Sequence, residues 1–141
     1  MPRSGVPTGQ VPQKLRILIA DDHAVIRKQV RLILEESSRF EVCAEAEDGA
    51  EAVEEARRLK PDVVILNVSM PVLNGLEAAR EIRAKLPESS IVILSANADK
   101  QFIEQAKRMG ADAYLAKTKA REALVKAVEA AVTGDEFVLV D

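Results

Sequence analysis

Five short segments rich in apolar residues recur along the chain. Each segment is about as long as a β-strand. These segments occupy residues 15–20, 40–46, 63–66, 91–94 and 113–115. We therefore predict five strands, and we expect the uninterrupted apolar run at 63–66 to be buried on both faces of the sheet.

The stretches between these segments carry apolar residues every three or four positions, which is the period of an amphipathic helix. The predicted inner faces comprise Ile26, Val30, Ile33 and Leu34; Ala52, Ala56 and Leu59; Leu76, Ala79, Ile82 and Leu86; Phe102, Ile103, Ala106 and Met109; and Leu124, Ala127, Val128 and Ala131. Asp48 and Asn74 each stand three residues before a glutamate, a spacing typical of helix N-termini. Gly110 and Gly134 are expected at helix ends.

Five strand–helix units in strict alternation predict a doubly wound parallel α/β sheet, because right-handed crossovers place helices on both faces. We expect the folded domain to span residues 15–133. Residues 1–14 contain three prolines and two glycines, and this composition predicts a disordered leader. Residues 134–141 end in an apolar segment without an evident partner and are expected to form a tail or the start of a linker.

Composition narrows the classes of function. Aromatic residues make up only 3% of the 141 residues and the net charge is −3, so we expect no nucleic-acid binding by this chain alone. The chain has no apolar run of the length that spans a bilayer. Its N-terminus lacks the hydrophobic core of a secretion signal. We therefore predict a cytoplasmic protein that does not enter the membrane.

Polar residues follow the predicted strands at their carboxyl ends, where open parallel sheets carry their working sites. These residues are Asp21 and Asp22, Asn67, Ser95 and Lys117. Paired carboxylates suit Mg²⁺, and an ammonium group with a hydroxyl suits phosphoryl oxygens. A purely structural interpretation is that Asp22 caps the first helix and that Lys117 makes a solvated ion pair.

The residues at these strand ends closely resemble those of response regulator receiver domains, in particular the NarL/FixJ-like branch. The resemblance covers about residues 15–132 and is carried by four motifs: IADDH at 19–23, VVILNVSMPVLNG at 63–75, LSA at 94–96 and YLAK at 114–117. It implies the flavodoxin-like receiver fold, with five parallel strands in the order 2-1-3-4-5.

The resemblance also implies a Mg²⁺ site. Asp21 and Asp22 would hold the cation, together with the side chain at position 67 and the backbone carbonyl of Ser69.

Phosphoryl-group roles follow in the same way. Asn67 stands at the phosphoacceptor position, Lys117 would bridge the acceptor and the phosphoryl group, and Ser95 would be the switch hydroxyl. Tyr114 would be the switch aromatic, although a purely structural aromatic is a close alternative. His23, the single histidine, is expected to be positional and not a phosphodonor.

An asparagine at the acceptor position changes the expected chemistry. A receiver aspartate attacks phosphorus through a carboxylate oxygen, whereas the neutral amide of Asn67 is a poor nucleophile. We therefore predict that this chain is not phosphorylated at position 67 and that Mg²⁺ binding is weakened. Asn67 is either an engineered replacement of an aspartate or the native residue of an atypical receiver; the two alternatives are left open.

The leading prediction is a non-enzymatic module of a two-component phosphorelay that binds a histidine kinase or another signalling protein. Homodimers are expected through the fourth helix, fifth strand and fifth helix, or through the first and fifth helices. A DNA-binding output domain is expected in a longer parent chain. The alternative is a small Mg²⁺-dependent α/β phosphatase-like enzyme with Asp21 or Asp22 as nucleophile.

Overall fold

Strands and helices alternate from Leu15 to Val140 in the part of the chain that the structure describes, as the apolar pattern predicts. The computed structural model describes residues 14–97, 99–134 and 136–140; the predicted leader, residues 1–14, lies outside these ranges except for Lys14. The elements are β1 (Leu15–Ala20), α1 (Ala24–Glu35), β2 (Phe40–Ala46), α2 (Gly49–Leu59), β3 (Val63–Asn67), α3 (Gly75–Lys85), β4 (Ser90–Ser95), α4 (Lys100–Arg108), β5 (Ala113–Ala116), the 3₁₀ turn η1 (Lys117–Lys119), α5 (Ala120–Thr133) and β6 (Val138–Val140).

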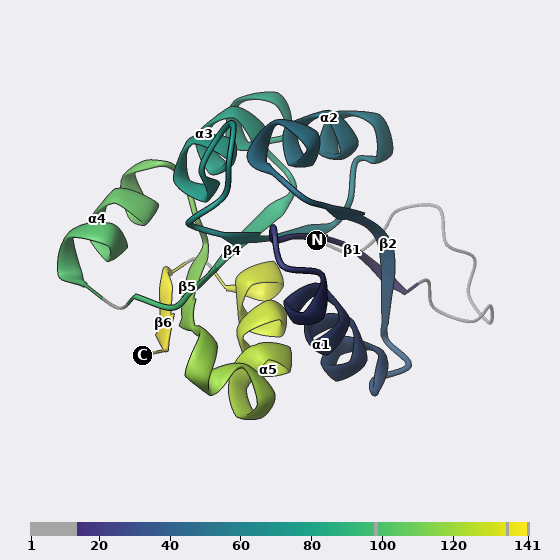
Figure 1. Cartoon of the computed structure of the whole chain (residues 1–141). Helices are drawn as coiled ribbons and strands as arrows, with labels where there is room; N and C mark the ends of the chain where they lie inside the picture. The colour runs from purple at the N-terminus through teal and green to yellow at the C-terminus, as the bar shows by residue number, and fades with distance from the viewer. Residues whose placement is uncertain (1–13, 98, 135, 141) are drawn as a thin grey trace.

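The strands form one parallel sheet in the order β2-β1-β3-β4-β5-β6. The doubly wound parallel architecture and the order of the first five strands are confirmed, but the predicted count of five is wrong. The sixth strand pairs with β5, with Tyr114 opposite Leu139 (Figure 1). A parallel neighbour requires a crossover connection of a dozen or more residues, and α5 supplies one between β5 and β6.

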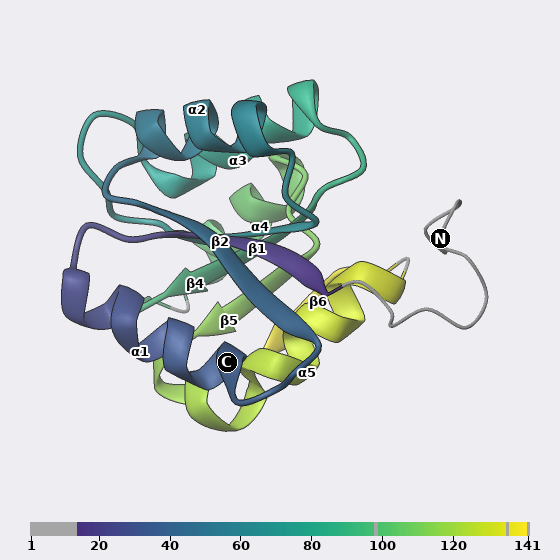
Figure 2. The same ribbon diagram turned by 90° about the vertical axis from the view of Figure 1, so that its right-hand side faces the viewer.

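Helices cover both faces of the sheet, with α2 and α3 on one side and α1 and α5 on the other (Figure 2). Because side chains alternate along a strand, Leu18 and Val64 face the layer that contains α2, α3 and α4. Their neighbours Ile17 and Val63 face the layer that contains α1 and α5. Two apolar cores result, one on each face of the sheet, and they hold the strand ends in fixed register.

The start of α3 is fixed against the end of β3. Asn74 forms a capping box with Glu77, as its spacing predicts. The next residue, Gly75, donates its backbone N–H to the carbonyl oxygen of Val68 at 2.8 Å. A Cβ atom at Gly75 would lie 2.0 Å from the carbonyl oxygen of Asn67, so only glycine permits this approach. The β3–α3 loop is thereby held close to the strand end.

The described helices are all too short or too polar to cross a lipid bilayer.

Candidate functional site

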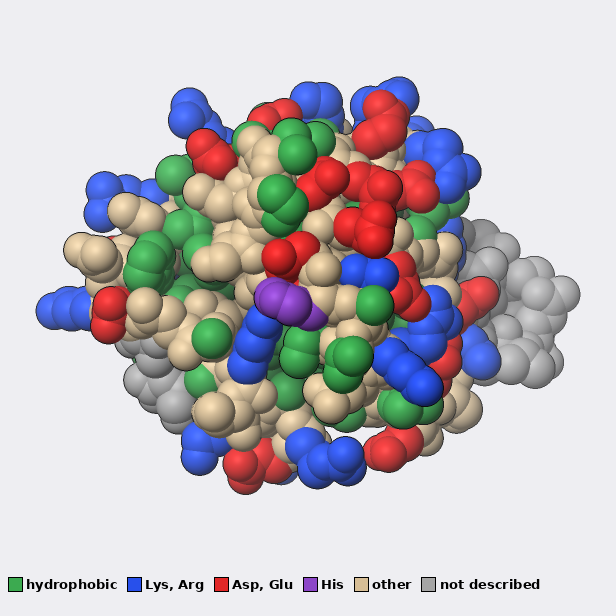
Figure 3. Space-filling model, in the orientation of Figure 1, with side chains coloured by type: hydrophobic (Ala, Val, Ile, Leu, Met, Phe, Trp, Pro, Cys, Tyr) green, Lys and Arg blue, Asp and Glu red, His purple; other side chains and the backbone are tan. Residues whose placement is uncertain are grey.

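The predicted site residues meet at the carboxyl edge of the sheet. Asn67 ends β3 opposite Leu94, the residue before Ser95. Ser95 ends β4 opposite Ala116, the residue before Lys117. Parallel register therefore places these three polar residues on adjacent strand ends. Figure 3 views the molecule from this edge and shows the one histidine at the centre, with acidic side chains beside it.

Asp21 is the buried anion of the site, with 2% of its surface exposed. Its Oδ1 accepts the backbone N–H of His23 at 2.9 Å. Its Oδ2 lies 3.0 Å from the ammonium nitrogen of Lys117, but not in hydrogen-bonding geometry. Within the described residues, this oxygen is the buried side-chain atom without a hydrogen-bond donor, and it is therefore the atom most in need of a further cation or donor.

Asp21, Asp22 and His23 form an open group of side chains that we call the acidic corner. The ring Nδ1 of His23 lies 3.1 Å from Asp21 Oδ1 and 3.2 Å from Asp22 Oδ1. Ligand atoms from Asp21, Asp22 and His23 all lie within 4.8 Å of one another. The structural alternative for Asp22 is wrong, because the N-cap of α1 is His23, which makes no side-chain capping bond. Lys117 likewise pairs with a buried carboxylate and does not form a solvated ion pair.

Asn67 is buried, with 5% exposed, and its amide turns toward oxygen atoms. The Nδ2 atom donates to the backbone carbonyl of Ser69 at 2.8 Å and, over a longer 3.4 Å, to Asp22 Oδ1. Both partners are acceptors, so the nitrogen must face them. The resemblance implies that the side chain at position 67 is a ligand of the cation, but in this conformation Asn67 presents its amide nitrogen, which cannot coordinate a metal ion, toward these oxygens.

Ser95 and Tyr114 are joined through the β4–α4 loop. The Ser95 hydroxyl oxygen accepts the backbone N–H of Asn97 at 3.0 Å. The Tyr114 hydroxyl donates to the Asn97 carbonyl oxygen, and its side chain is fully buried. Burial raises the pKa of the Tyr114 phenol, a hydrogen bond with Ser95 offsets part of that rise, and the charge of Asp99 adds to it. The phenol is therefore neutral at physiological pH.

Arg27 supports the acidic corner, a role that our sequence analysis missed. Its guanidinium donates to the Asp21 carbonyl oxygen at 2.7 Å and to Glu45 Oε1 at 2.9 Å. Burial alone would raise the pKa of Glu45, but hydrogen bonds from Arg31 and Arg27 hold it below its ordinary value. Arg27 lies four residues after His23, which puts it one helical turn further along α1. That spacing was the available signal.

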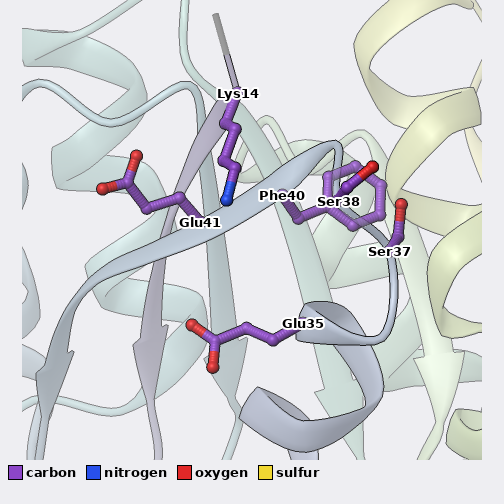
Figure 4. Close-up of a pocket in the computed structure, with 6 residues that line it drawn as sticks. All are labelled: Lys14, Glu35, Ser37, Ser38, Phe40 and Glu41. Atoms are coloured by element: carbon purple, nitrogen blue, oxygen red, sulfur yellow. The ribbon is translucent and has the colours of Figure 1, made fainter.

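A hollow in the described surface adjoins the site, and another lies away from it. The hollow beside the acidic corner has a volume of about 510 Å³ and is lined by Asp22, Val68, Ser69, Met70, Asn74 and Phe102. The other, of about 420 Å³, is lined by Lys14, Glu35, Ser37, Ser38, Phe40 and Glu41 (Figure 4). It lies where β1 and β2 begin, away from the strand ends that carry the polar residues, so it adds nothing to the site.

The oxygen set fits a hard divalent cation such as Mg²⁺, which prefers carboxylate and carbonyl ligands. Asp21 Oδ2 lacks a hydrogen-bond donor, and ligand atoms of Asp21 and Asp22 lie within 4.8 Å of one another. The Ser69 carbonyl shares the Asn67 nitrogen with the Asp22 carboxylate. The fit requires one rearrangement, because the Asn67 nitrogen now faces two of these oxygens.

Comparison with known proteins identifies relatives along most of the chain. The family pattern described as "Response regulator receiver domain" matches residues 17–129. The transcriptional regulatory protein DegU of Brevibacillus brevis is 35% identical over 89% of this chain and 53% of its own length. The transcriptional regulatory protein PdtaR of Mycobacterium tuberculosis is 43% identical over 84% of this chain and 57% of its own length.

A solved structure with a similar level of sequence identity to this chain has the same fold. The signal receiver domain of the response regulator NarL from Mycobacterium tuberculosis superposes with a TM-score of 0.83 at 35% identity, covering 87% of this chain and 99% of that domain. The chain thus spans about half the length of the curated relatives it matches and nearly all of a solved receiver domain.

Proposed function

This chain belongs to the response regulator receiver family, and from that premise we propose that Asn67 stands at its phosphoacceptor position. The observation that carries the proposal is the shared edge: Asn67 ends β3 between the acidic corner of Asp21 and Asp22 and the strand that delivers Ser95. The domain is then a two-component receiver that keeps its surrounding site but lacks the nucleophile.

The residues around position 67 would have different roles in such a site. Asp21, Asp22 and the Ser69 carbonyl would hold Mg²⁺, which when bound neutralises charge on phosphoryl oxygens. Lys117, now paired with Asp21, would balance negative charge on a group bound at position 67. Ser95 would report an added group by exchanging its bond from Asn97 for one to that group, and Tyr114 is joined to the same loop.

The amide removes the covalent step. In a receiver with aspartate at this position, a carboxylate oxygen attacks phosphorus, the new oxygen–phosphorus bond forms, and the bond to the donor's leaving group breaks. Asn67 has no anionic oxygen for that attack. We therefore propose a module that works by binding partners and is not itself phosphorylated at position 67. The phosphatase-like alternative gains no support from the relatives, which are named as transcriptional regulators.

We infer the binding partners from the family to which the chain belongs, and a possible second domain from the greater length of its relatives. We propose that a histidine kinase or another signalling protein contacts this cytoplasmic domain, and that residues 15–133 form the receiver unit. Residues 134–141, which include β6, would lead toward a DNA-binding output domain in a longer parent.

The surface of α4 is a candidate contact surface, with four exposed polar residues: Lys100, Gln101, Gln105 and Arg108. A homodimer through α4, β5 and α5 would have to include β6, which occupies the β5 edge; α1 and α5 offer the other surface.

Beryllium fluoride, which mimics a phosphoryl group on a carboxylate, tests this assignment. We expect ¹⁹F NMR to show a protein-bound, Mg²⁺-dependent signal with the Asn67→Asp variant and none with the protein as written. Asn74→Asp is a matched control: it adds the same charge nearby, and aspartate caps helices as well as asparagine. A bound signal with the unaltered protein, or none with folded Asn67→Asp, would show that position 67 is not the acceptor position.

A further inference from the structure

The side chain of Asn67 bridges two oxygens that belong to the proposed cation site. One is the Ser69 carbonyl, 2.8 Å from Nδ2, and the other is the Asp22 carboxylate, 3.4 Å from Nδ2. Together these two hydrogen bonds form what we call the Asn67 bridge. Its donor nitrogen carries partial positive charge and points to where a divalent cation would have to contact the same oxygens.

A carboxylate at position 67 could not form this bridge. It would present only acceptors to Ser69 and Asp22, and the three groups would be held together by a cation or would move apart. With asparagine, the loop after β3 is tied to the acidic corner by the protein's own atoms. The remaining buried anion, Asp21, already has the Lys117 ammonium at 3.0 Å.

Coordination by Asn67 requires the bridge to break. To offer its amide oxygen, the side chain must turn half a revolution about its last torsion, which moves Nδ2 away from both acceptors. Asn67 is 95% buried, since only 5% of its surface is exposed, so water does not freely replace the lost hydrogen bonds. The bridge and a bound cation therefore compete for the Ser69 and Asp22 oxygens.

We propose that the Asn67 amide substitutes internally for the divalent cation and holds the receiver site in a metal-independent state. This inference rests on the proposed function, because it takes position 67 and the neighbouring oxygens to be the receiver's acceptor and cation site. It makes the chain a receiver whose loop and acidic corner are ordered whether or not Mg²⁺ is present.

Comparison of asparagine, alanine and aspartate at position 67 distinguishes an amide that competes with the cation from an amide that coordinates it. If the amide competes, Asn67→Ala frees the Ser69 and Asp22 oxygens and should bind Mg²⁺ roughly tenfold more tightly than the protein as written, the gain expected from no longer breaking two hydrogen bonds. Asn67→Asp should bind more tightly still. If the amide oxygen coordinates the cation instead, Asn67→Ala loses a ligand and binds more weakly than the unaltered chain.

The measurement is EPR detection of free Mn²⁺ during titration of each variant, followed by displacement with Mg²⁺. Gln29→Ala, which removes an exposed amide on α1, is the control and should leave the affinity for the cation unchanged. An affinity for the cation that decreases from aspartate to alanine to asparagine at position 67 supports the proposal. An affinity that decreases from aspartate to asparagine to alanine overturns it. A failure of the proposed function can be distinguished from a failure of this inference, because in the former case the Asn67→Asp variant binds no beryllium fluoride.

A second measurement needs no substitution in the tested sample. The Asn67 side-chain NH₂ resonances, assigned by their absence from Asn67→Asp, should show slow hydrogen exchange and keep their positions as Mg²⁺ is added at millimolar concentration. Rapid exchange in the metal-free protein, or a large shift that saturates with Mg²⁺, would mean that no lasting bridge exists.

Discussion

At the scale of single residues, the site depends on one amide and on which of its two ends faces the acidic corner. The sequence was sufficient to predict that Asn67 would follow a buried strand beside Asp21 and Asp22, because strand ends in a parallel sheet share an edge. It was not sufficient to predict that Nδ2 would face Ser69 and Asp22, since that depends on which acceptors the folded loop brings near.

The buried tyrosine offers a residue-scale prediction on pH. The folded pKa of Tyr114 is raised above its ordinary value of about 10, so the unfolded chain ionises first as pH rises. The stability contributed by the neutral phenol should be complete below about pH 10 and should be lost as pH rises through the folded pKa. Tyr114 is the only tyrosine and the chain has no tryptophan, so the absorbance of the phenolate reports this group alone.

The matched variant is Tyr114→Phe, whose unfolding free energy should fall less steeply in alkali. If the folded protein titrates at the ordinary phenol value, then the tyrosine is not held in the buried position that its bond to Asn97 indicates.

At the scale of elements, the starts of α2 and α3 and the first five strands could be predicted, because each follows from a local pattern. Asn74 with Glu77 forms its capping box, and Gly110 adopts a positive φ of 96° at the end of α4. The sixth strand could not be predicted in this way. Residues 138–140 are apolar and short, and their partner β5 is distant in sequence, so only the folded α5 brings the two together.

Removal of the sixth strand should destabilise the domain. In a chain that ends at Gly134, the partly buried Phe137, Val138 and Val140 no longer pack against the two cores. We expect a loss of about 2–3 kcal/mol in the free energy of unfolding by urea, from about 1 kcal/mol for each partly buried side chain. The uncovered β5 edge should also increase self-association, measured by sedimentation.

Leu139 provides the control for this deletion, because it points outward with 46% of its surface exposed. Leu139→Ser should change stability by no more than about 0.5 kcal/mol. An unchanged urea midpoint in the shortened chain would mean that β6 does not stay paired with β5 in solution.

At the scale of the whole molecule, the chain has the receiver fold, and the site that we propose for it lies at the carboxyl edge of the sheet. The fold and the grouping of Asp21, Asp22, Asn67, Ser95 and Lys117 on one sheet edge could be foreseen, because strand order and strand ends determine both. The direction of the Asn67 amide could not, because it depends on which acceptors the folded loop brings near. For Arg27, the helical spacing from His23 indicated a position near the site, but not its contacts with Asp21 and Glu45.

We propose that a single amide, that of Asn67, separates this chain from a receiver that accepts a phosphoryl group. Intact mass spectrometry after incubation with acetyl phosphate and Mg²⁺ tests it most directly. We predict no added phosphoryl group on the protein as written and one added group on Asn67→Asp, abolished when Lys117 is also changed to alanine. A phosphoryl adduct on the unaltered chain that maps to position 67, or no adduct on a folded Asn67→Asp variant, would contradict the claim.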